Sequence, residues 1–476
     1  MARGRLHGSL GTARRGGPTN TGTMPLTLSV VVLAAGAGKR MNSDLPKVLH
    51  RVAGVPMINH VVAAVRALEP STVVVVIGAG HEAVGRAVAP CATIVQDPPK
   101  GTGHALMTAM PALPAGGEVL VVLGDAPLLS ADTTRRLVEA RRAAHAAVAV
   151  LGFRAADPAP YGRLVCDAAG EPLKIVEARD CTPDQFKIDL VNSGVMAFDG
   201  TLLPGLLDRL RPTNVQGEYY VTDLIEHARA EGRRCIVVDG PEAEFLGVNS
   251  RAELAAVEAA MQDRLRRRAM DGGVTMIDPS SVWMSADTVL GRDVRIEPNT
   301  VFGSGVRIGD RVEIKAFCHI EGAEIGDDAI VGPYARVRPG SRIGRAAHIG
   351  NFVEVKNATL GEGVKANHLA YVGDADIGAR TNIGAGVICV NYDGFGKWRT
   401  VVGADAFVGS NAALVAPIRV GDRANVAAGS VITSDVADET MAFGRARQED
   451  KPGLAPKMRA RLKARAADPA MKNRKA

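Results

Sequence analysis

Two hydrophobic patterns divide the chain. Over residues 28–250, short apolar runs alternate with stretches of helical periodicity. From Val289 to Ile432, aliphatic residues recur every six positions, and Gly follows many of them, as in Ile325-Gly326 and Ile343-Gly344. A period of six fits neither a helix nor an alternating strand. It predicts a solenoid in which each hexad forms one side of a triangular coil and the aliphatic side chains stack inside.

The first region predicts strands and helices in alternation. The strands are expected at 28–33, 73–77, 94–95 and 118–123, and the helices at 57–68, at 81–89 and after 105. This order is typical of a mostly parallel, Rossmann-like α/β sheet that binds its ligands at the carboxyl ends of the strands. Asp125 stands at such an end, where a carboxylate is a candidate Mg²⁺ ligand.

A Gly-rich loop follows the first strand. It reads Ala34-Ala-Gly-Ala-Gly-Lys-Arg-Met41, and Leu45-Pro46-Lys47 comes soon after. Backbone N–H groups in such a loop bind phosphate. The loop lacks the GK[ST] of a P-loop and the completed GxGxxG of a dinucleotide fold. The basic residues after it favour a phosphate site over a purely structural turn.

The expected domain limits follow from these patterns. Ser250 to Glu253 forms a capping box, an apolar stripe follows at helical spacing, and Gly272-Gly273 ends the helix. We expect a disordered basic extension at 1–25, an α/β domain at 26–249 and a linker helix at 250–272. The solenoid is expected at 273–440, and a C-terminal segment with a basic tail at 441–476.

Composition limits the partners. The net charge of +6 suits anionic small substrates. We interpret the basic tail as a solvated terminus, and we expect neither binding to nucleic acid nor a membrane span. The six cysteines show no CxxC spacing, which favours reduced thiols in the cytoplasm over a disulfide frame or a zinc site. The first 23 residues lack the apolar segment of a secretory signal.

Three polar segments and one loop interrupt the solenoid's aliphatic pattern. The segments are 334–340, 351–356 and 367–374, and they contain Arg338, Lys356 and His368. Residues about eighteen apart stack on successive coils, so Arg338 and Lys356 suit one phosphate. His368 is the candidate general base, because imidazole titrates near neutrality. The loop at 391–400 leaves the coil and is expected to have a task.

Both halves resemble known families. The hexads are similar to the left-handed β-helix of hexapeptide acyltransferases, and this resemblance implies the handedness, because generic crossovers are right-handed. The Gly-rich loop, Pro46-Lys47 and Gly124-Asp125 resemble sugar nucleotidyltransferases. The segment QGEYYVTD at 216–223 adds to these motifs. By this resemblance the chain is identified as a member of the bifunctional uridyltransferase–acetyltransferases, which synthesise UDP-N-acetylglucosamine for peptidoglycan and lipopolysaccharide.

That resemblance implies the reactions and the site residues. Glucosamine 1-phosphate is acetylated by acetyl-CoA, and UMP then passes from UTP to N-acetylglucosamine 1-phosphate with Mg²⁺ and release of pyrophosphate, in a homotrimer. The implied UDP-N-acetylglucosamine site contains Leu33, Ala34, Ala35, Gly36, Arg40, Lys47, Gln96, Gly101, Thr102, Gly124, Asp125, Gly162, Glu177, Asn192 and Asn249, and Asp125 and Asn249 would bind the metal. His368 would be the base, with Arg338, Lys356, Tyr371 and Asn382 on glucosamine 1-phosphate and Ala385, Asn391, Tyr392, Ser410, Ala428 and Arg445 on acetyl-CoA.

Two alternatives stay open at this point. The chain could be a monofunctional sugar-phosphate nucleotidyltransferase whose repeats only mediate oligomerisation. It could also be a non-catalytic scaffold with both sites degraded. The polar residues within the solenoid argue against the first alternative, and Lys47, Asp125, Asn249 and His368 argue against the second.

Overall fold

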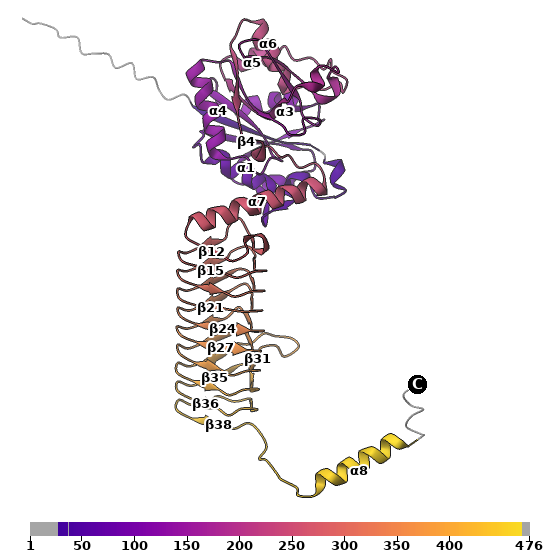
Figure 1. Cartoon of the computed structure of the whole chain (residues 1–476). Coiled ribbons are helices and arrows are strands. Elements are labelled where there is room, and N and C mark those ends of the chain that lie inside the picture. The colour runs from indigo at the N-terminus through magenta and orange to yellow at the C-terminus, as the bar shows by residue number, and fades with distance from the viewer. Residues whose placement is uncertain (1–26, 37, 469–476) are drawn as a thin grey trace, which may run out of the picture. The chain divides into compact units, whose positions relative to one another are not determined.

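The computed structural model describes residues 27–36 and 38–468 (Figure 1). The chain forms two compact units, Met1–Met261 and Gln262–Ala476. The division falls inside helix α7 (Arg251–Asp271), at the place where the sequence predicts a linker helix. The expected extension at 1–25 and the last eight residues of the tail lie outside the described residues.

The first unit is built on a mostly parallel sheet. Its strands run in the order β11-β7-β10-β6-β1-β4-β5, and β10 is antiparallel to both β6 and β7. Their bounds are β1 Leu28–Ala34, β4 Thr72–Gly78, β5 Ala92–Gln96, β6 Glu118–Leu123, β7 Val148–Arg154, β10 Leu190–Asp199 and β11 Cys235–Asp239. The predicted strands at 28–33, 73–77, 94–95 and 118–123 are therefore confirmed.

Helices cover both faces of this sheet. One apolar core joins it to α1 (Met57–Arg66), α2 (Glu82–Ala87) and α4 (Ala131–Ala144). The other core joins it to α3 (Thr102–Ala109), α5 (Leu203–Leu207) and α6 (Leu224–Ala230). Because β1 is buried on both faces, all seven of its residues are apolar or small, and the loop that follows β1 opens at the carboxyl edge of the sheet.

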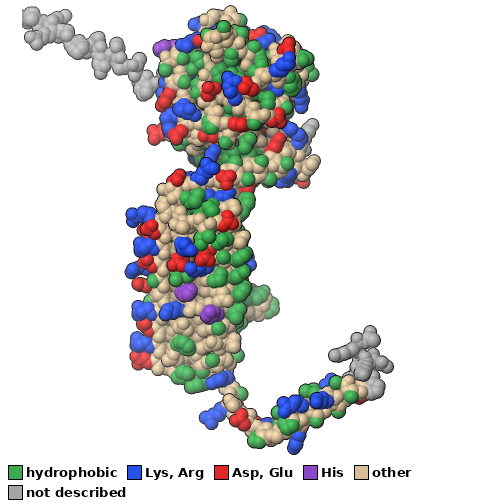
Figure 2. All heavy atoms as spheres, viewed as in Figure 1, with side chains coloured by type: hydrophobic (Ala, Val, Ile, Leu, Met, Phe, Trp, Pro, Cys, Tyr) green, Lys and Arg blue, Asp and Glu red, His purple; other side chains and the backbone are tan. Residues whose placement is uncertain are grey.

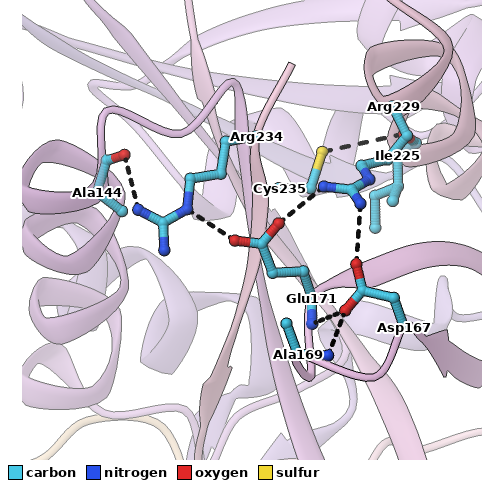
Figure 3. A network of polar contacts seen from close by, with 8 residues as sticks. All are labelled: Ala144, Asp167, Ala169, Glu171, Ile225, Arg229, Arg234 and Cys235. Atoms are coloured by element: carbon cyan, nitrogen blue, oxygen red, sulfur yellow. Dashed lines mark hydrogen bonds and ion pairs between the residues drawn. The ribbon is translucent and has the colours of Figure 1, made fainter. Parts of the chain in front are cut away.

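A hairpin of β8 (Arg163–Cys166) and β9 (Pro172–Val176) is anchored by arginines (Figure 3). Arg229 of α6 donates to Asp167 at 2.9 Å and to Glu171 at 2.8 Å, and Arg234 donates to Glu171 at 2.8 Å. The hydrogen bond from Arg234, together with Arg229, lowers the pKa of Glu171. Since β9 leads directly into Glu177, this network fixes the strand that presents a predicted sugar-binding carboxylate.

Helix α7 begins with the predicted capping box. Ser250 Oγ accepts from the Glu253 N–H at 3.2 Å, and the Glu253 carboxylate accepts from the N–H groups of Ser250 and Asn249 at 2.9 and 2.5 Å. The box therefore positions Asn249, a predicted metal ligand, at the start of a rigid element.

The second unit is the predicted β-helix. Its short strands form three parallel sheets. The first runs from β12 (Thr275–Met276) to β38 (Met441–Ala442), the second from β13 (Trp283–Met284) to β37 (Val431–Ile432), and the third from β14 (Val289–Leu290) to β35 (Ile418–Val420). Residues 17 or 18 apart pair across successive coils, as in Ile320↔Val337 and Val337↔Val355, and these side chains are fully buried.

The corners of the β-helix differ in chemistry. One corner carries ion pairs on successive coils, such as Arg311 with Asp328 at 2.7 Å and Arg423 with Glu439 at 2.9 Å. Another carries a ladder of exposed apolar side chains, which we call the aromatic ladder: Phe317, Tyr334, Phe352 and Leu369. Figure 2 shows charged side chains gathered along one edge of the coil and hydrophobic ones along another.

Beyond the coil lies helix α8 (Leu454–Ala467), which is exposed along its whole length. None of the helices in the described part of the chain combines the length and the apolar character that crossing a bilayer requires.

Candidate active sites

A cleft of about 400 Å³ lies at the carboxyl edge of the first unit's sheet. Its lining includes nine predicted residues: Leu33, Ala34, Ala35, Gly36, Lys47, Gln96, Gly101, Thr102 and Asp125. The cleft also contains Leu123 and Glu218, which sequence reasoning did not assign to the site. The predicted nucleotide loop and the predicted base-reading loop thus face one cavity.

Close backbone approaches explain two glycines here. Gly124 donates its N–H to Leu33 O at 2.9 Å, and a Cβ at Gly124 would lie 3.2 Å from the same oxygen. Gly101 has φ +98°, and a Cβ there would lie 2.5 Å from Tyr219 O. The loops after β1, β5 and β6 therefore pack too tightly for side chains at these positions.

Gln96 is buried and held in place by two hydrogen-bond partners. It is 3% exposed, and its Nε2 lies 3.0 Å from Gly101 O and 3.0 Å from His104 Nδ1. Burial, with a smaller contribution from Lys100, lowers the pKa of His104, so the neutral ring accepts a hydrogen bond from Gln96. A carboxamide fixed in this way can read the edge of a nucleobase.

Lys47 and Asp125 line the cleft, and Lys47 also joins Asp125 to Asn249, which lies outside the lining. The Lys47 ammonium donates to Asp125 Oδ2 and, at 3.1 Å, to Asn249 Oδ1. Asp125 follows β6 and Asn249 precedes α7, so residues 124 positions apart aim two oxygens at one cation. No group of three or more His, Cys, Asp and Glu suited to a metal occurs among the described residues. A divalent cation here would need further oxygens from a substrate.

The predicted sugar-binding residues also gather. Asn192 donates its N–H to Gly162 O at 2.8 Å, and a Cβ at Gly162 would lie 3.2 Å from Glu177 Oε2. Thr222 Oγ1 donates to Glu177 Oε1 at 3.2 Å. Burial is the main cause of the raised pKa of Glu177. Arg40 differs from this group, because its side chain is exposed and does not line the cleft.

Carboxyl groups crowd the neighbouring cavity of about 440 Å³, which is lined by Glu177, Asp180, Asp223 and Glu226. Burial and then the charges of Glu226, Glu177 and Asp180 raise the pKa of Asp223 to about 6. In the sequence, Asp223 is only the last residue of the motif at 216–223, and its partial burial could not be predicted from that motif.

In the second unit, His368 is oriented by Asn351. The two residues pair across β24 (His348–Asn351) and β27 (Lys365–His368), and His368 Nδ1 lies 2.7 Å from Asn351 Oδ1. Since a carboxamide oxygen only accepts, Nδ1 carries the proton and Nε2 is left with its lone pair. In its neutral form the exposed ring therefore presents the Nε2 lone pair, which the predicted general base would need.

Cations converge around a buried carboxylate one corner away. Asp374 is 7% exposed and accepts from Asn357 at 2.6 Å and from Asn391, while Lys356 Nζ lies 3.6 Å away. Lys356 is the main cause of the lowered pKa of Lys397, and Arg338 acts in the same direction. Asp374 thus helps to hold three cations close together, as a phosphate site requires.

Glu354, Asp374 and Lys397 were not assigned by sequence reasoning. Arg338 donates to Glu354 Oε1 at 2.8 Å. Lys397 returns to the site because the loop at 391–400 folds on itself: Tyr392 bridges to Lys397, and Asp393 accepts from two backbone N–H groups and from Trp398. These hydrogen bonds lower the pKa of Asp393 to about 2. The predicted Tyr371 joins the site through its hydroxyl, 3.4 Å from Asn391 Nδ2.

Three of the six residues predicted for acetyl-CoA, Ala385, Ser410 and Ala428, continue the column of Asn351 and His368. The register Ile349↔Ala366↔Ile383↔Val408↔Val426, continued two residues further, aligns Asn351, His368, Ala385, Ser410 and Ala428. Asn382 begins β30 (Asn382–Ile383) on the same sheet. Arg445 is exposed and follows β38 in the chain.

Together, the fold and the two sites define a class of protein, a nucleotidyltransferase joined to a hexapeptide-repeat acyltransferase. Family models agree with this class. A MobA-like NTP transferase domain matches residues 30–184, a bacterial transferase hexapeptide (six repeats) matches 287–322 and 322–357, and a hexapeptide repeat of succinyl-transferase matches 399–434.

Relatives then specify the family. The bifunctional protein GlmU of Paramagnetospirillum magneticum is 54% identical, covering 92% of this chain and 98% of its own. Those of Rhodospirillum rubrum and Paracoccus denitrificans are 54% and 52% identical, covering 91% and 90% of this chain and 98% and 97% of their own. The chain belongs to the family of the bifunctional protein GlmU. The predicted family, fold class and bifunctional transferase role are confirmed.

Proposed function

We propose that the second unit acetylates glucosamine 1-phosphate with acetyl-CoA and that the first unit transfers UMP from UTP to N-acetylglucosamine 1-phosphate, releasing pyrophosphate. One observation supports the double assignment: the solenoid carries both a group of cations around Asp374 and a histidine that Asn351 orients. A solenoid that served only for oligomerisation would need neither. This activity supplies the amino-sugar nucleotide for peptidoglycan and lipopolysaccharide.

Uridylyl transfer requires an anion to approach a polyanion. We assign the triphosphate to the loop after β1 and to Lys47, with Arg40 closing from outside. Uracil is assigned to Gln96, Gly101 and Thr102, supported by their shared cleft. The sugar is assigned to Gly162, Glu177 and Asn192. The attacking phosphate oxygen bonds to the α-phosphorus while pyrophosphate leaves, so catalysis rests on oriented donors and positive charge more than on a base.

Mg²⁺ is assigned to Asp125 and Asn249. Their oxygens already converge on the Lys47 ammonium, so the donor pair fits a cation, and Mg²⁺ ordinarily completes such a pair with substrate phosphates. When bound there, the metal would neutralise charge that develops on the phosphate oxygens.

Acetyl transfer starts with proton removal from the substrate's ammonium. His368 Nε2 accepts that proton, and the freed nitrogen bonds to the thioester carbonyl carbon. The second proton of the nitrogen then passes to the departing sulfur as the carbon–sulfur bond breaks, so CoA leaves as the thiol. Arg338, Lys356 and Lys397 hold the sugar phosphate, while Tyr371 and Asn382 contact the sugar. The column through Ala385, Ser410 and Ala428 offers small side chains along which a pantetheine arm can lie. Asn391, Tyr392 and Arg445 remain assigned to acetyl-CoA.

A homotrimer is proposed from the aromatic ladder. Phe352 and Leu369 are 56% and 59% exposed and directly follow Asn351 and His368. The rings of Phe317 and Tyr334 stack at 4.8 Å, and those of Tyr334 and Phe352 at 5.1 Å, so the ladder is a continuous apolar edge. A second copy on this edge would cover it and enclose the acetyl site.

Domain limits and location complete the proposal. We keep the limits 26–249, 250–272, 273–440 and 441–476, supported by α7 and by the β12–β38 coil. A cytoplasmic location is supported by six free cysteines.

Two substitutions test the two-site assignment. Asp125→Ala should abolish pyrophosphate release from UTP and leave CoA release intact, because the altered carboxylate belongs only to the nucleotide cleft. His368→Ala should lower CoA release by about 10² to 10⁴ and spare pyrophosphate release. If either variant lost both activities while keeping its unfolding temperature, the assignment would be wrong.

A further inference from the structure

Lys47 occupies the position at which the metal is proposed. It begins a short 3-10 helix (Lys47–Leu49) after Pro46, and its side chain is 13% exposed. Its ammonium donates to both Asp125 and Asn249, the two residues assigned to the divalent cation. The stem is confined as well, because a Cβ at Gly38 would lie 2.7 Å from Lys47 Cβ.

We infer that Lys47 guards the metal position: in the nucleotide-free enzyme its ammonium fills the place of the divalent cation, which enters only together with a triphosphate. The inference rests on the proposed function, since it takes Asp125 and Asn249 as metal ligands. It adds that the Lys47 ammonium competes with the divalent cation for this site, and that the cation binds only together with the triphosphate.

Charge balance supports the competition. The carboxylate of Asp125 provides one negative charge, and Lys47 already neutralises it. A dication placed between Asp125 and Asn249 would lie within a few ångströms of an ammonium, and like charges repel strongly in a partly buried site. The ammonium must therefore leave before the dication binds tightly.

A triphosphate supplies the reason for Lys47 to leave. Among the described residues that line the cleft, Lys47 carries the positive charge, and it borders the Gly-rich loop after β1. Phosphate oxygens placed in that loop offer the ammonium a new anionic partner, and they also bring the oxygens that the two-residue metal site lacks. Nucleotide and dication thus enter together, and free dication is excluded from an empty site.

Binding of Mn²⁺, read by the electron paramagnetic resonance signal of the free ion, tests this order in the full-length enzyme. Because UTP itself binds Mn²⁺, each titration with UTP is compared with an enzyme-free titration at the same UTP concentration. Lys47→Met removes the charge and keeps the length of the side chain. Lys100→Met removes the same charge from an exposed position outside the lining of the cleft, and Lys47→Arg keeps the charge at 47. Each variant is checked for its unfolding temperature and circular dichroism.

Without nucleotide, Lys47→Met should bind Mn²⁺ at least about tenfold more tightly than the parent chain, while Lys100→Met and Lys47→Arg should match the parent. Addition of UTP should tighten Mn²⁺ binding by the parent at least about tenfold and remove most of the difference from Lys47→Met. The inference would be overturned if Lys47→Met and the parent bound Mn²⁺ with equal affinity in the absence of nucleotide. It would also be overturned if Lys100→Met gained as much Mn²⁺ affinity as Lys47→Met.

Asp125→Asn separates this inference from the proposed function. It should abolish Mn²⁺ binding with and without UTP. If Asp125→Asn kept full Mn²⁺ affinity in the presence of UTP, the metal assignment itself would fall. If it lost that affinity while Lys47→Met gained none, the metal assignment would stand and only the guard would be rejected.

Discussion

Replacing Asn351 by Leu should slow acetyl transfer through the histidine that Asn351 orients. Leu has the branched shape of Asn and no acceptor, so it removes the 2.7 Å contact to His368 Nδ1, and the partly buried position leaves room for its larger side chain. Without that acceptor, the proton is no longer held on Nδ1, and the ring loses its fixed orientation. Both changes reduce the fraction of His368 that presents a basic Nε2.

The size of the effect follows from one hydrogen bond. A typical intramolecular hydrogen bond contributes about 0.5–1.5 kcal/mol net. At about 1.36 kcal/mol for each tenfold change in rate, that corresponds to a loss of about 2- to 13-fold. This loss is much smaller than the one expected for His368→Ala, because the base itself remains.

CoA release at saturating substrates measures the acetylation rate, and pyrophosphate release from UTP in the same preparation is the control. Asn351→Asp provides a matched rescue, since its carboxylate again accepts from Nδ1. The negative charge added in Asn351→Asp favours the imidazolium form of the ring, so the acidic limb of this variant's pH–rate profile should move to higher pH. A full acetylation rate in Asn351→Leu would refute the orienting role, and so would a fall as large as that of His368→Ala.

Three further outcomes are expected. Phe352→Asp should weaken self-association about 10- to 150-fold, because each Phe loses about 1.5–3 kcal/mol of burial, and should lower acetyl transfer but not uridylyl transfer. Light scattering measures the mass of the assembly, and an unchanged mass would contradict the proposed interface. Because burial raises the pKa of Asp223 to about 6, its contribution to stability is present below pH 4 and lost as pH rises towards 6, so Asp223→Asn should flatten that part of the unfolding profile. Glu118 and Arg141 are 1% and 5% exposed and form an ion pair at 2.6 Å, so Glu118→Ala should lower the free energy of unfolding by about 3–5 kcal/mol in urea titration, with Glu118→Gln losing less.

Several parts of the site depended on tertiary structure. Lys47, Asp125 and Asn249 were each predicted, but the hydrogen bonds that join them span 78 and 202 positions of sequence. Lys397 was passed over, because only the folding of the loop through Asp393 returns its ammonium to Lys356. The antiparallel β10 inside a parallel sheet was also not predicted. Chain path and side-chain direction in these places follow from contacts between distant segments, and no local pattern records them.

By itself, the sequence determined the coil and its register. Each hexad places one aliphatic side chain inside the coil, and these side chains are all buried only when successive coils stack in phase. Residues 17 or 18 apart must therefore lie one above another, as Asn351 and His368 do. The α/β order likewise followed from short apolar runs that alternate with stretches of helical periodicity. Which side chains share one proton or one cation was decided by the tertiary structure alone, because hydrogen bonds depend on distances of tenths of an ångström that periodicity does not encode.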